Sequence, residues 1–177
     1  MIEQIIDKIN ADKKTVMAID GKCGAGKTTL ANKIREIYNC DVICMDDFFL
    51  PLDLRTDERL NEPGGNIHYE RFIEEVADKI DNTIEYKIFD CSRMDFNGTK
   101  TIHPQQLLIV EGSYSLHPKF AYIYNLKVFV DVAEEEQLRR IKKRSPQLYN
   151  KFKNIWIPME NRYFAEFKIK ESCDVVV

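Results

Sequence analysis

Long hydrophobic runs are missing from this 177-residue chain, since no apolar stretch reaches the length that a membrane-spanning helix needs. The first ten residues, MIEQIIDKIN, carry acids among their apolar side chains and do not form a secretory signal. We therefore expect a cytoplasmic protein with no membrane partner.

Paired cysteines and regularly spaced histidines are missing as well. The five cysteines are an odd number and include no C-x-x-C pair, so neither a disulfide framework nor a zinc site is indicated. His68, His103 and His117 have no metal-like spacing. We expect packed, reduced thiols, and histidines with structural or surface roles.

An excess of positive charge is also absent. The formal net charge is -3, so the chain as a whole is not built to hold nucleic acid by bulk attraction. Hydrophobic residues make up 44% and charged residues 31%, which are ordinary values for a soluble globular protein. No repeat, linker or low-complexity tract interrupts the chain, and its length fits one domain, placed at 1–177. The oligomeric state is not indicated.

Short apolar runs alternate with segments of helical periodicity. The predicted strands are 15–20, 41–45, 84–90, 107–110 and 126–132, and 174–177 can add a last one. Helices are predicted at 28–38, 69–80, 134–144 and 157–170, with a short amphipathic one at the N-terminus. Asn97-Gly98 is a hairpin-turn signal. This order predicts an α/β fold, with a mostly parallel five-stranded sheet and helices on both faces.

Ligands of such sheets bind beyond the carboxyl ends of the strands. The residues predicted at those ends are 21–28, Asp46, Asp90 and Glu111. The polar stretch 51–66 is predicted as a long loop, and loops of that length in compact domains are usually functional.

A phosphate-binding loop follows the first buried strand. Gly21-Lys22-Cys23-Gly24-Ala25-Gly26-Lys27-Thr28 matches G-x-x-x-x-G-K-[ST] between a strand and a helix, which predicts a P-loop nucleoside triphosphate hydrolase fold. The glycines let backbone N–H groups surround the phosphates at a helix N-terminus. Lys27 is expected on the β- and γ-phosphates and the Thr28 hydroxyl on Mg²⁺. The expected nucleotide-binding residues are Gly21, Gly24, Ala25, Gly26, Lys27, Thr28 and Thr29.

Carboxylates stand at two further strand ends. A kinase that acts on an alcohol needs a carboxylate to orient the acceptor hydroxyl and take its proton. Asp46 is favoured for this role over its neighbour Asp47. Glu111 ends the apolar run 107–110, where an acid could hold a water on Mg²⁺. Asp20 precedes the loop directly, and a structural role is expected there.

A basic segment lies before Ser145-Pro146. Charge runs on helices are usually solvated faces, but in a phosphoryl-transfer enzyme they can form a lid that delivers arginines to the transferring phosphate. We expect a lid at about 139–152, with Arg140 and Arg144, four residues apart on one helical face, as its catalytic arginines. Further along, Trp156, Glu160, Tyr163 and Phe164 lie at helical spacing and are predicted to pack, with Trp156 near the nucleotide.

Taken in order, these segments resemble the uridine kinase branch of the uridine kinase and phosphoribulokinase-like family. The resemblance runs through 21–28, Asp46-Asp47-Phe48-Phe49 as a D-x-F-[YF] motif, 86–93, 107–112, 128–131 and 138–144. It implies a kinase fold with an arginine-rich lid, ATP or GTP as the donor, and Mg²⁺. By this match Asp46 is the general base, Glu111 assists the metal, and Arg140 and Arg144 are lid arginines.

The resemblance also concerns the acceptor pocket. Tyr86 falls where that family places an aromatic ring against the nucleoside base. Two motifs differ: Asn61 stands where the nucleoside kinases have an aspartate, and Cys91 replaces a histidine before Ser92-Arg93. The residues expected to shape a changed acceptor pocket are therefore Asn61, Glu62, Cys91 and Arg93.

The leading interpretation is an ATP-dependent phosphotransferase with an alcohol acceptor, either a uridine- or cytidine-like nucleoside or a similar small molecule. A sugar-like or pantothenate-like acceptor stays open within that class. A nucleotide-binding regulatory ATPase is the second interpretation, although the absence of N-K-x-D speaks against a GTPase. A nucleic-acid end kinase is the third, and the acidic net charge argues against it.

Overall fold

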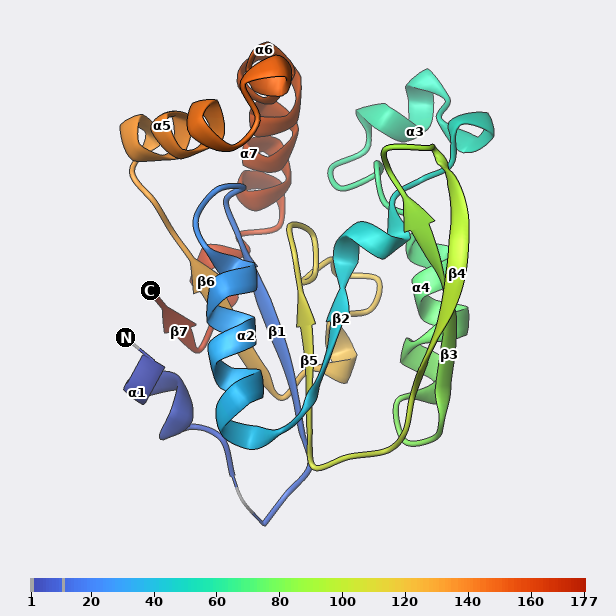
Figure 1. Ribbon diagram of the computed structural model, residues 1–177, viewed down its shortest axis with the longest axis vertical. Coiled ribbons are helices and arrows are strands. Elements are labelled where there is room, and N and C mark those ends of the chain that lie inside the picture. The colour runs from blue at the N-terminus through green and yellow to red at the C-terminus, as the bar shows by residue number, and fades with distance from the viewer. Residues whose placement is uncertain (1, 11) are drawn as a thin grey trace.

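Five parallel strands form the central sheet of the computed structural model, which describes residues 2–10 and 12–177. Their order is β2-β5-β1-β6-β7, and their bounds in that order are Asp41–Cys44, Leu107–Glu111, Thr15–Gly21, Leu126–Val130 and Val175–Val176. Because β1 is central and buried along its whole length, the loop that follows it emerges at the middle of the carboxyl edge (Figure 1). The predicted α/β fold with a five-stranded parallel sheet is confirmed.

The membership of the sheet differs from the prediction at one strand. β3 (Ile84–Asp90) pairs antiparallel with β4 (Asp95–Ile102) in a separate hairpin, so Asp90 does not lie at the main sheet's carboxyl edge. Alternating burial along β3 explains this, because such a pattern suits a ribbon with one covered face. The predicted turn at Asn97-Gly98 is wrong: these residues lie within β4, and the chain reverses at 91–94. β7 supplies the fifth strand of the main sheet instead.

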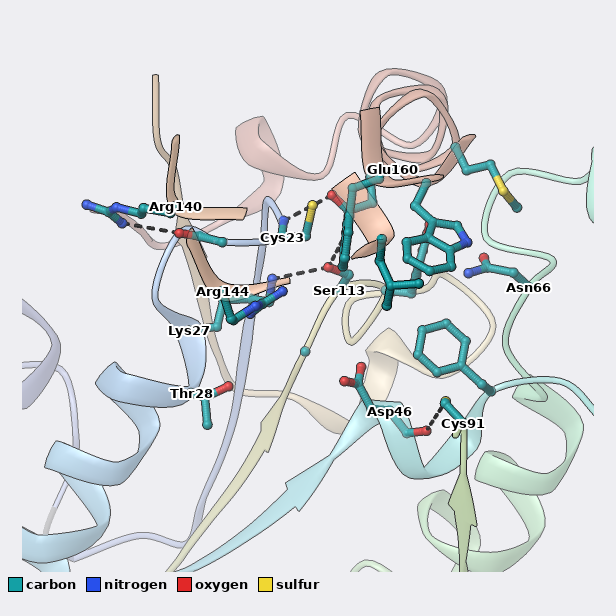
Figure 2. A pocket seen from close by; sticks show the side chains of 18 of the residues that line it. Cys23, Lys27, Thr28, Asp46, Asn66, Cys91, Ser113, Arg140, Arg144 and Glu160 are labelled. Carbon is teal, nitrogen blue, oxygen red and sulfur yellow. Dashed lines mark hydrogen bonds between the residues drawn. The ribbon is translucent and has the colours of Figure 1, made fainter. Parts of the chain in front are cut away.

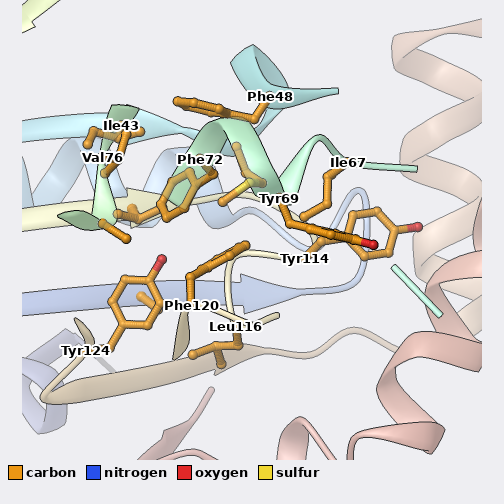
Figure 3. Packing of buried hydrophobic residues seen from close by; sticks show 14 of the residues in the cluster. Ile43, Phe48, Ile67, Tyr69, Phe72, Val76, Tyr114, Leu116, Phe120 and Tyr124 are labelled. Carbon is orange, nitrogen blue, oxygen red and sulfur yellow. The ribbon is translucent and has the colours of Figure 1, made fainter. Parts of the chain in front are cut away.

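Hydrophobic side chains cover both faces of the sheet. On one face, α1 (Ile2–Ile6) and α2 (Lys27–Tyr38) pack over alternate residues such as Met17 and Ile109. The other face meets α4 (Tyr69–Glu75), α7 (Ile157–Glu166) and the segment 114–124. Figure 3 shows the aromatic centre of this second layer, where the Phe72 ring lies 4.2 Å from that of Phe120 and 5.0 Å from that of Phe48. These packed layers hold in place the carboxyl ends of the strands, where the polar residues of the candidate site lie.

A set of helical segments after β6 stands above the carboxyl edge (Figure 1). α5 (Glu134–Arg144) has the predicted bounds and ends at Ser145 before Pro146, because proline cannot continue a helix. A 3₁₀ turn, α6 (Tyr149–Lys151) and a π-helical turn at Phe152–Trp156 lead into α7. α7 is shorter than predicted, since Lys168 adopts a left-handed backbone with φ 49°.

The segment between β2 and β3 lies on the other side of the carboxyl edge (Figure 1). It contains a 3₁₀ turn at Met45–Phe48, a second one at Leu52–Leu54, and α3 (Asp57–Asn61) before α4 begins. The predicted long loop 51–66 therefore carries short helical turns. α4 ends earlier than the predicted residue 80, and a 3₁₀ turn at Ala77–Lys79 continues it.

Within the described residues, none of the helices combines the length and the apolar character needed to cross a membrane. The predicted domain 1–177 includes Met1 and Ala11, which lie outside the described residues.

Candidate active site

A cavity of about 1020 Å³ opens above the carboxyl edge of the sheet. The phosphate-binding loop and the helices after β6 line one side, and residues of the segment 46–66 line the other. Figure 2 shows the polar side chains that face it. The predicted placement of the site, beyond the strand ends, agrees with this geometry.

The phosphate-binding loop has the backbone that a cradle of N–H groups requires. Gly21 has φ 134°, and a Cβ there would lie 2.1 Å from the carbonyl oxygen of Val130, so only glycine fits. Gly26, with φ 108°, is the N-cap of α2 and has no side chain that could cap the first N–H groups of the helix. The positive end of the α2 dipole therefore points at the cavity, where an anion would bind.

Lys27 is folded back onto the loop. Its Nζ donates to the carbonyl oxygens of Gly21 at 2.7 Å and Lys22 at 3.0 Å, and to the Ser113 hydroxyl at 3.1 Å. All three ammonium protons are thus used by the protein, and the cation lies at the base of the phosphate cradle. Reaching a phosphate oxygen requires Lys27 to give up at least one of these bonds.

Thr28 and Glu111 form an oxygen-rich pair beside this cradle. The Thr28 hydroxyl lies 3.1 and 3.2 Å from the two Glu111 carboxylate oxygens. Glu111, the last residue of β5, is level with Ile19 of β1 and Cys44 of β2. Burial raises the pKa of Glu111 and nearby Asp46 adds to this, whereas Thr28 and Lys27 oppose it. A hydroxyl and one carboxylate suit Mg²⁺, which keeps most of its own waters, so these two residues fit the predicted metal site.

Asp46 faces the same cavity from the 3₁₀ turn after β2 (Figure 2). Enclosure by the surrounding protein raises its pKa, and the positive charges of Lys27 and Arg144 oppose the rise. Asp47 points away, because it accepts a hydrogen bond of 3.1 Å from the Tyr86 hydroxyl and does not line the cavity. The geometry thus separates the two neighbouring acids as the sequence suggested, with Asp46 at the cavity.

The two predicted lid arginines have different surroundings. Arg140 donates to the carbonyl oxygens of Gly24 at 3.2 Å and Ala25 at 3.1 Å, and it pairs with Glu136 at 2.6 Å, so it holds the phosphate-binding loop from outside. Arg144 makes no hydrogen bond to another described residue, and it lines the cavity together with Lys27 and Ser113 (Figure 2). Of the two predicted lid arginines, Arg144 is therefore the one that is available to a ligand.

A buried carboxylate from α7 also touches the loop. Glu160 is 5% exposed and accepts the Ser113 hydroxyl at 2.6 Å and the backbone N–H of Cys23 at 3.0 Å. The chain Glu160–Ser113–Lys27 links α7 to the phosphate-binding lysine (Figure 2). Glu160 was predicted as a packing residue. An acid at helical spacing from Trp156 and Tyr163, on a face that is otherwise aromatic, is the sequence signal that distinguishes it.

Cys23, in the phosphate-binding loop, has surroundings that keep its thiol protonated. Desolvation and the nearby Glu160 carboxylate raise the pKa of the Cys23 thiol to about 12, which keeps it protonated. Lys22, the other variable loop residue, forms an ion pair of 2.7 Å with Asp131. Asp20, below the loop, is fully buried and accepts hydrogen bonds from the Tyr163 hydroxyl and the Leu116 N–H, in agreement with its expected structural role.

The predicted acceptor residues are not brought together. Tyr86 is buried beneath the cavity wall with its ring 5.1 Å from Phe48, while Asn61 at the end of α3 and Arg93 in the β3–β4 turn do not line the cavity. Cys91, at the second altered motif, does line it. The other side chains on this wall come from the segment 46–66, namely Phe49, Arg55, Leu60 and Asn66.

The chain is similar in sequence and in fold to known P-loop proteins. The profile of the KAP family P-loop domain matches residues 1–154. The chain is 25% identical over 130 residues to uridine-cytidine kinase C of Dictyostelium discoideum, covering 72% of this chain and 29% of that protein. It is 30% identical over 137 residues to a uridine kinase of Chlamydia pneumoniae, covering 71% of this chain and 62% of that protein. The chain thus spans less than two thirds of the length of either relative.

A solved structure described as a possible uridine kinase from Bacillus stearothermophilus superposes with a TM-score of 0.72. The match covers 99% of this chain and 96% of that one at 17% sequence identity. At this level of identity the likeness concerns the fold, which is shared over nearly the whole length of both chains.

Proposed function

Because this chain belongs to the KAP family of P-loop domains and is a uridine kinase-like P-loop kinase, we propose that it transfers the γ-phosphate of ATP to a hydroxyl group of a small-molecule acceptor. The observation that carries the proposal is the position of Asp46. A carboxylate with a raised pKa lines the same cavity as the phosphate-binding loop, Lys27 and Arg144. Phosphoryl transfer needs a proton acceptor on one side of the phosphate and cations around it.

The transfer proceeds as one displacement at phosphorus. The acceptor oxygen forms a bond to the γ-phosphorus while the bond from that phosphorus to the β,γ-bridging oxygen breaks, and ADP leaves with the electron pair. The acceptor proton passes to the Asp46 carboxylate. Lys27, released from part of its bonding to the loop, and Arg144 stabilise the negative charge on the transferring group. Thr28 and Glu111 would hold Mg²⁺, which neutralises phosphate charge when bound.

Nucleosides are the acceptors that the likeness to uridine kinases favours. The cavity supports the kinase activity more than it supports uridine itself, because Tyr86, Asn61 and Arg93 do not line it. A regulatory ATPase would need no pocket for an acceptor, so the cavity wall that residues of the segment 46–66 form opposite the phosphate-binding loop favours the kinase. The test uses ATP with a radiolabelled γ-phosphate: label must move to an added alcohol, whereas label found only in inorganic phosphate would reject the proposal.

Arg144→Ala is expected to lower kcat by about 10²-fold, because the variant loses one cation that stabilises the negative charge on the phosphoryl group during transfer. ATP affinity should change much less, since the loop and Lys27 remain. Steady-state kinetics with saturating ATP measures the effect. Lys142→Ala is the matched control, because Lys142 lies on the same helix but does not line the cavity. Full activity of Arg144→Ala would exclude Arg144 from the transfer step.

Glu160→Gln is expected to bind ATP about 5-fold more tightly than the parent. Its carboxylate is held against the loop N–H of Cys23, so its charge opposes the incoming phosphates by roughly 1 kcal/mol. Titration calorimetry with a non-hydrolysable ATP analogue measures the affinity, and exposed Glu166 on the same helix gives the control variant Glu166→Gln. Weaker binding by Glu160→Gln would instead show that Glu160 holds the loop in its binding shape.

A further inference from the structure

Arg55 is a cation on the cavity wall without a partner for its charge. It follows the 3₁₀ turn Leu52–Leu54, and its Nε donates to the carbonyl oxygen of Leu50 at 2.7 Å. Among the described residues, no carboxylate forms an ion pair with it and its terminal Nη atoms have no hydrogen-bond partner. A guanidinium carries five donors in a planar fork, so most of the donors of Arg55 are unused.

Neighbouring arginines are paired within the fold. Arg59 forms two parallel hydrogen bonds of 2.7 and 2.8 Å with the carboxylate of Glu70, and Arg71 pairs with Glu75 at 2.9 Å. Arg55 is half-buried, and desolvation lowers its pKa while the nearby Cys91 thiol opposes the change, yet no carboxylate of the described residues forms an ion pair with it. Enclosing an unpaired cation is unfavourable unless something else balances the charge. The balancing anion is therefore expected from a ligand in the cavity.

The segment that carries Arg55 is held in place at both ends. Leu50 N–H donates to the Asn66 carbonyl at 3.0 Å, and Phe49 bridges to Ile67 as an isolated β-pair. Gly65 packs so closely that a Cβ would lie 1.9 Å from the carbonyl oxygen of Arg59. Arg55 thus extends from a closed loop whose ends are fixed against each other, and not from a free chain.

A second unused polar group lines the same wall. The Oδ1 atom of Asn66 is buried and has no hydrogen-bond partner among the described residues. Asn66 borders the space above Asp46 in Figure 2. A buried oxygen of this kind is costly to leave unpaired, and a ligand hydroxyl in the cavity could satisfy it only if the Asn66 side chain turned toward the cavity.

Arg55 and Asp46 come from one segment on one side of the cavity, whereas Arg140 and Arg144 come from the lid side with the phosphate-binding loop. Resting on the proposed function, we propose that the acceptor is an alcohol bearing a carboxylate or phosphate group, that Arg55 binds this anion, and that Asn66 turns to accept a hydrogen bond from one of its hydroxyls. The reacting hydroxyl of that acceptor lies at Asp46. Arg55 is then the residue that selects a charged acceptor over a neutral one.

The test compares alcohols that share a skeleton and differ in charge. ADP release is measured with glycerol, glycerate and glycerol 3-phosphate, with ribose and ribose 5-phosphate, and with uridine, cytidine and pantothenate. We expect at least one anionic member to exceed its neutral match by about 10-fold or more in kcat/KM, and the carboxylate and phosphate arms to identify the anion. Equal or faster turnover of the neutral acceptors would overturn the inference about Arg55 but not the proposed kinase activity. A lack of ADP release with every acceptor would overturn both the inference and the proposed activity.

The Arg55→Gln variant tests the residue itself. For the preferred anionic acceptor, its KM should rise by about 10- to 100-fold, as expected for the loss of a charge-assisted hydrogen bond. The KM for ATP should stay unchanged. A substitution that destabilised the whole cavity would change the KM for ATP as well. Arg55→Lys should recover part of the loss, and Arg35→Gln on the exposed surface of α2 is the matched control. An unchanged acceptor KM in Arg55→Gln would assign the anion to another group.

Discussion

Lys27→Ala is expected to abolish nucleotide-dependent activity, with a loss of at least about 10³-fold in kcat/KM for ATP. Lys27 is the cation at the base of the phosphate cradle, and among the described residues it is the lysine that bonds to the loop carbonyls of Gly21 and Lys22. Alanine removes both the ground-state attraction for the β- and γ-phosphates and the stabilisation of charge during transfer. Titration with ADP and steady-state kinetics separate these two losses.

Folding must be measured alongside this variant. Lys27 also donates to two loop carbonyl oxygens and to Ser113, so alanine removes three hydrogen bonds that hold the loop, although Ser113 still donates to Gly21 and Ala25 to Lys22. Thermal unfolding of Lys27→Ala and of Lys27→Met, which keeps much of the side-chain volume, shows whether the fold persists. A folded Lys27 variant that still turns over ATP at the parent rate would contradict the assignment.

Asp46→Asn is expected to retain ATP binding and to lower turnover by about 10²- to 10⁴-fold, the usual contribution of a positioned base. Asparagine keeps the shape of the side chain but cannot accept the proton of the acceptor hydroxyl. Asp47→Asn is the matched control, because Asp47 bonds to Tyr86 and does not line the cavity. Equal turnover of Asp46→Asn and the parent would remove Asp46 from the base role.

The pH dependence of the parent follows from the same residue. Asp46 must be ionised to accept a proton, so kcat/KM should fall as the pH drops through its pKa. Burial raises that pKa above the ordinary value of 3.8, with Lys27 and Arg144 opposing the rise. The acidic limb should therefore lie at a higher pH than an ordinary aspartate gives. It should be absent from the residual activity of Asp46→Asn.

Local patterns predicted most of the fold. Apolar runs bounded by turns located the strands of the main sheet, and the phosphate-binding motif fixed the junction between β1 and α2. The bounds of α5 were predictable because Pro146 ends its periodic pattern. The separation of β3 from the sheet was not predictable in this way, since sheet membership depends on which distant segments pack together. The alternation of buried and exposed residues along β3 was the one local sign of its separation from the main sheet.

Some residues of the candidate site were also predictable from the sequence, and others were not. Lys27, Thr28, Asp46 and Glu111 were predictable because each sits at a strand end that the chain order brings to one edge. Arg55 and Asn66 were not, since nothing in their spacing shows which of many polar residues turns inward. Tyr86 shows the converse case: its motif position suggested a ligand contact, but its ring packs against Phe48 and its hydroxyl is used by Asp47.

The most direct test of the proposed kinase activity measures ADP formed from ATP by the purified chain with Mg²⁺, with and without each alcohol of the panel. We expect ADP to form at an appreciable rate only when an acceptor is present, in equal amount to a phosphorylated alcohol, and Asp46→Asn to remove this dependence. Tight ATP binding with no acceptor-dependent ADP, or hydrolysis at the same rate with and without acceptors, would contradict it and favour a regulatory ATPase.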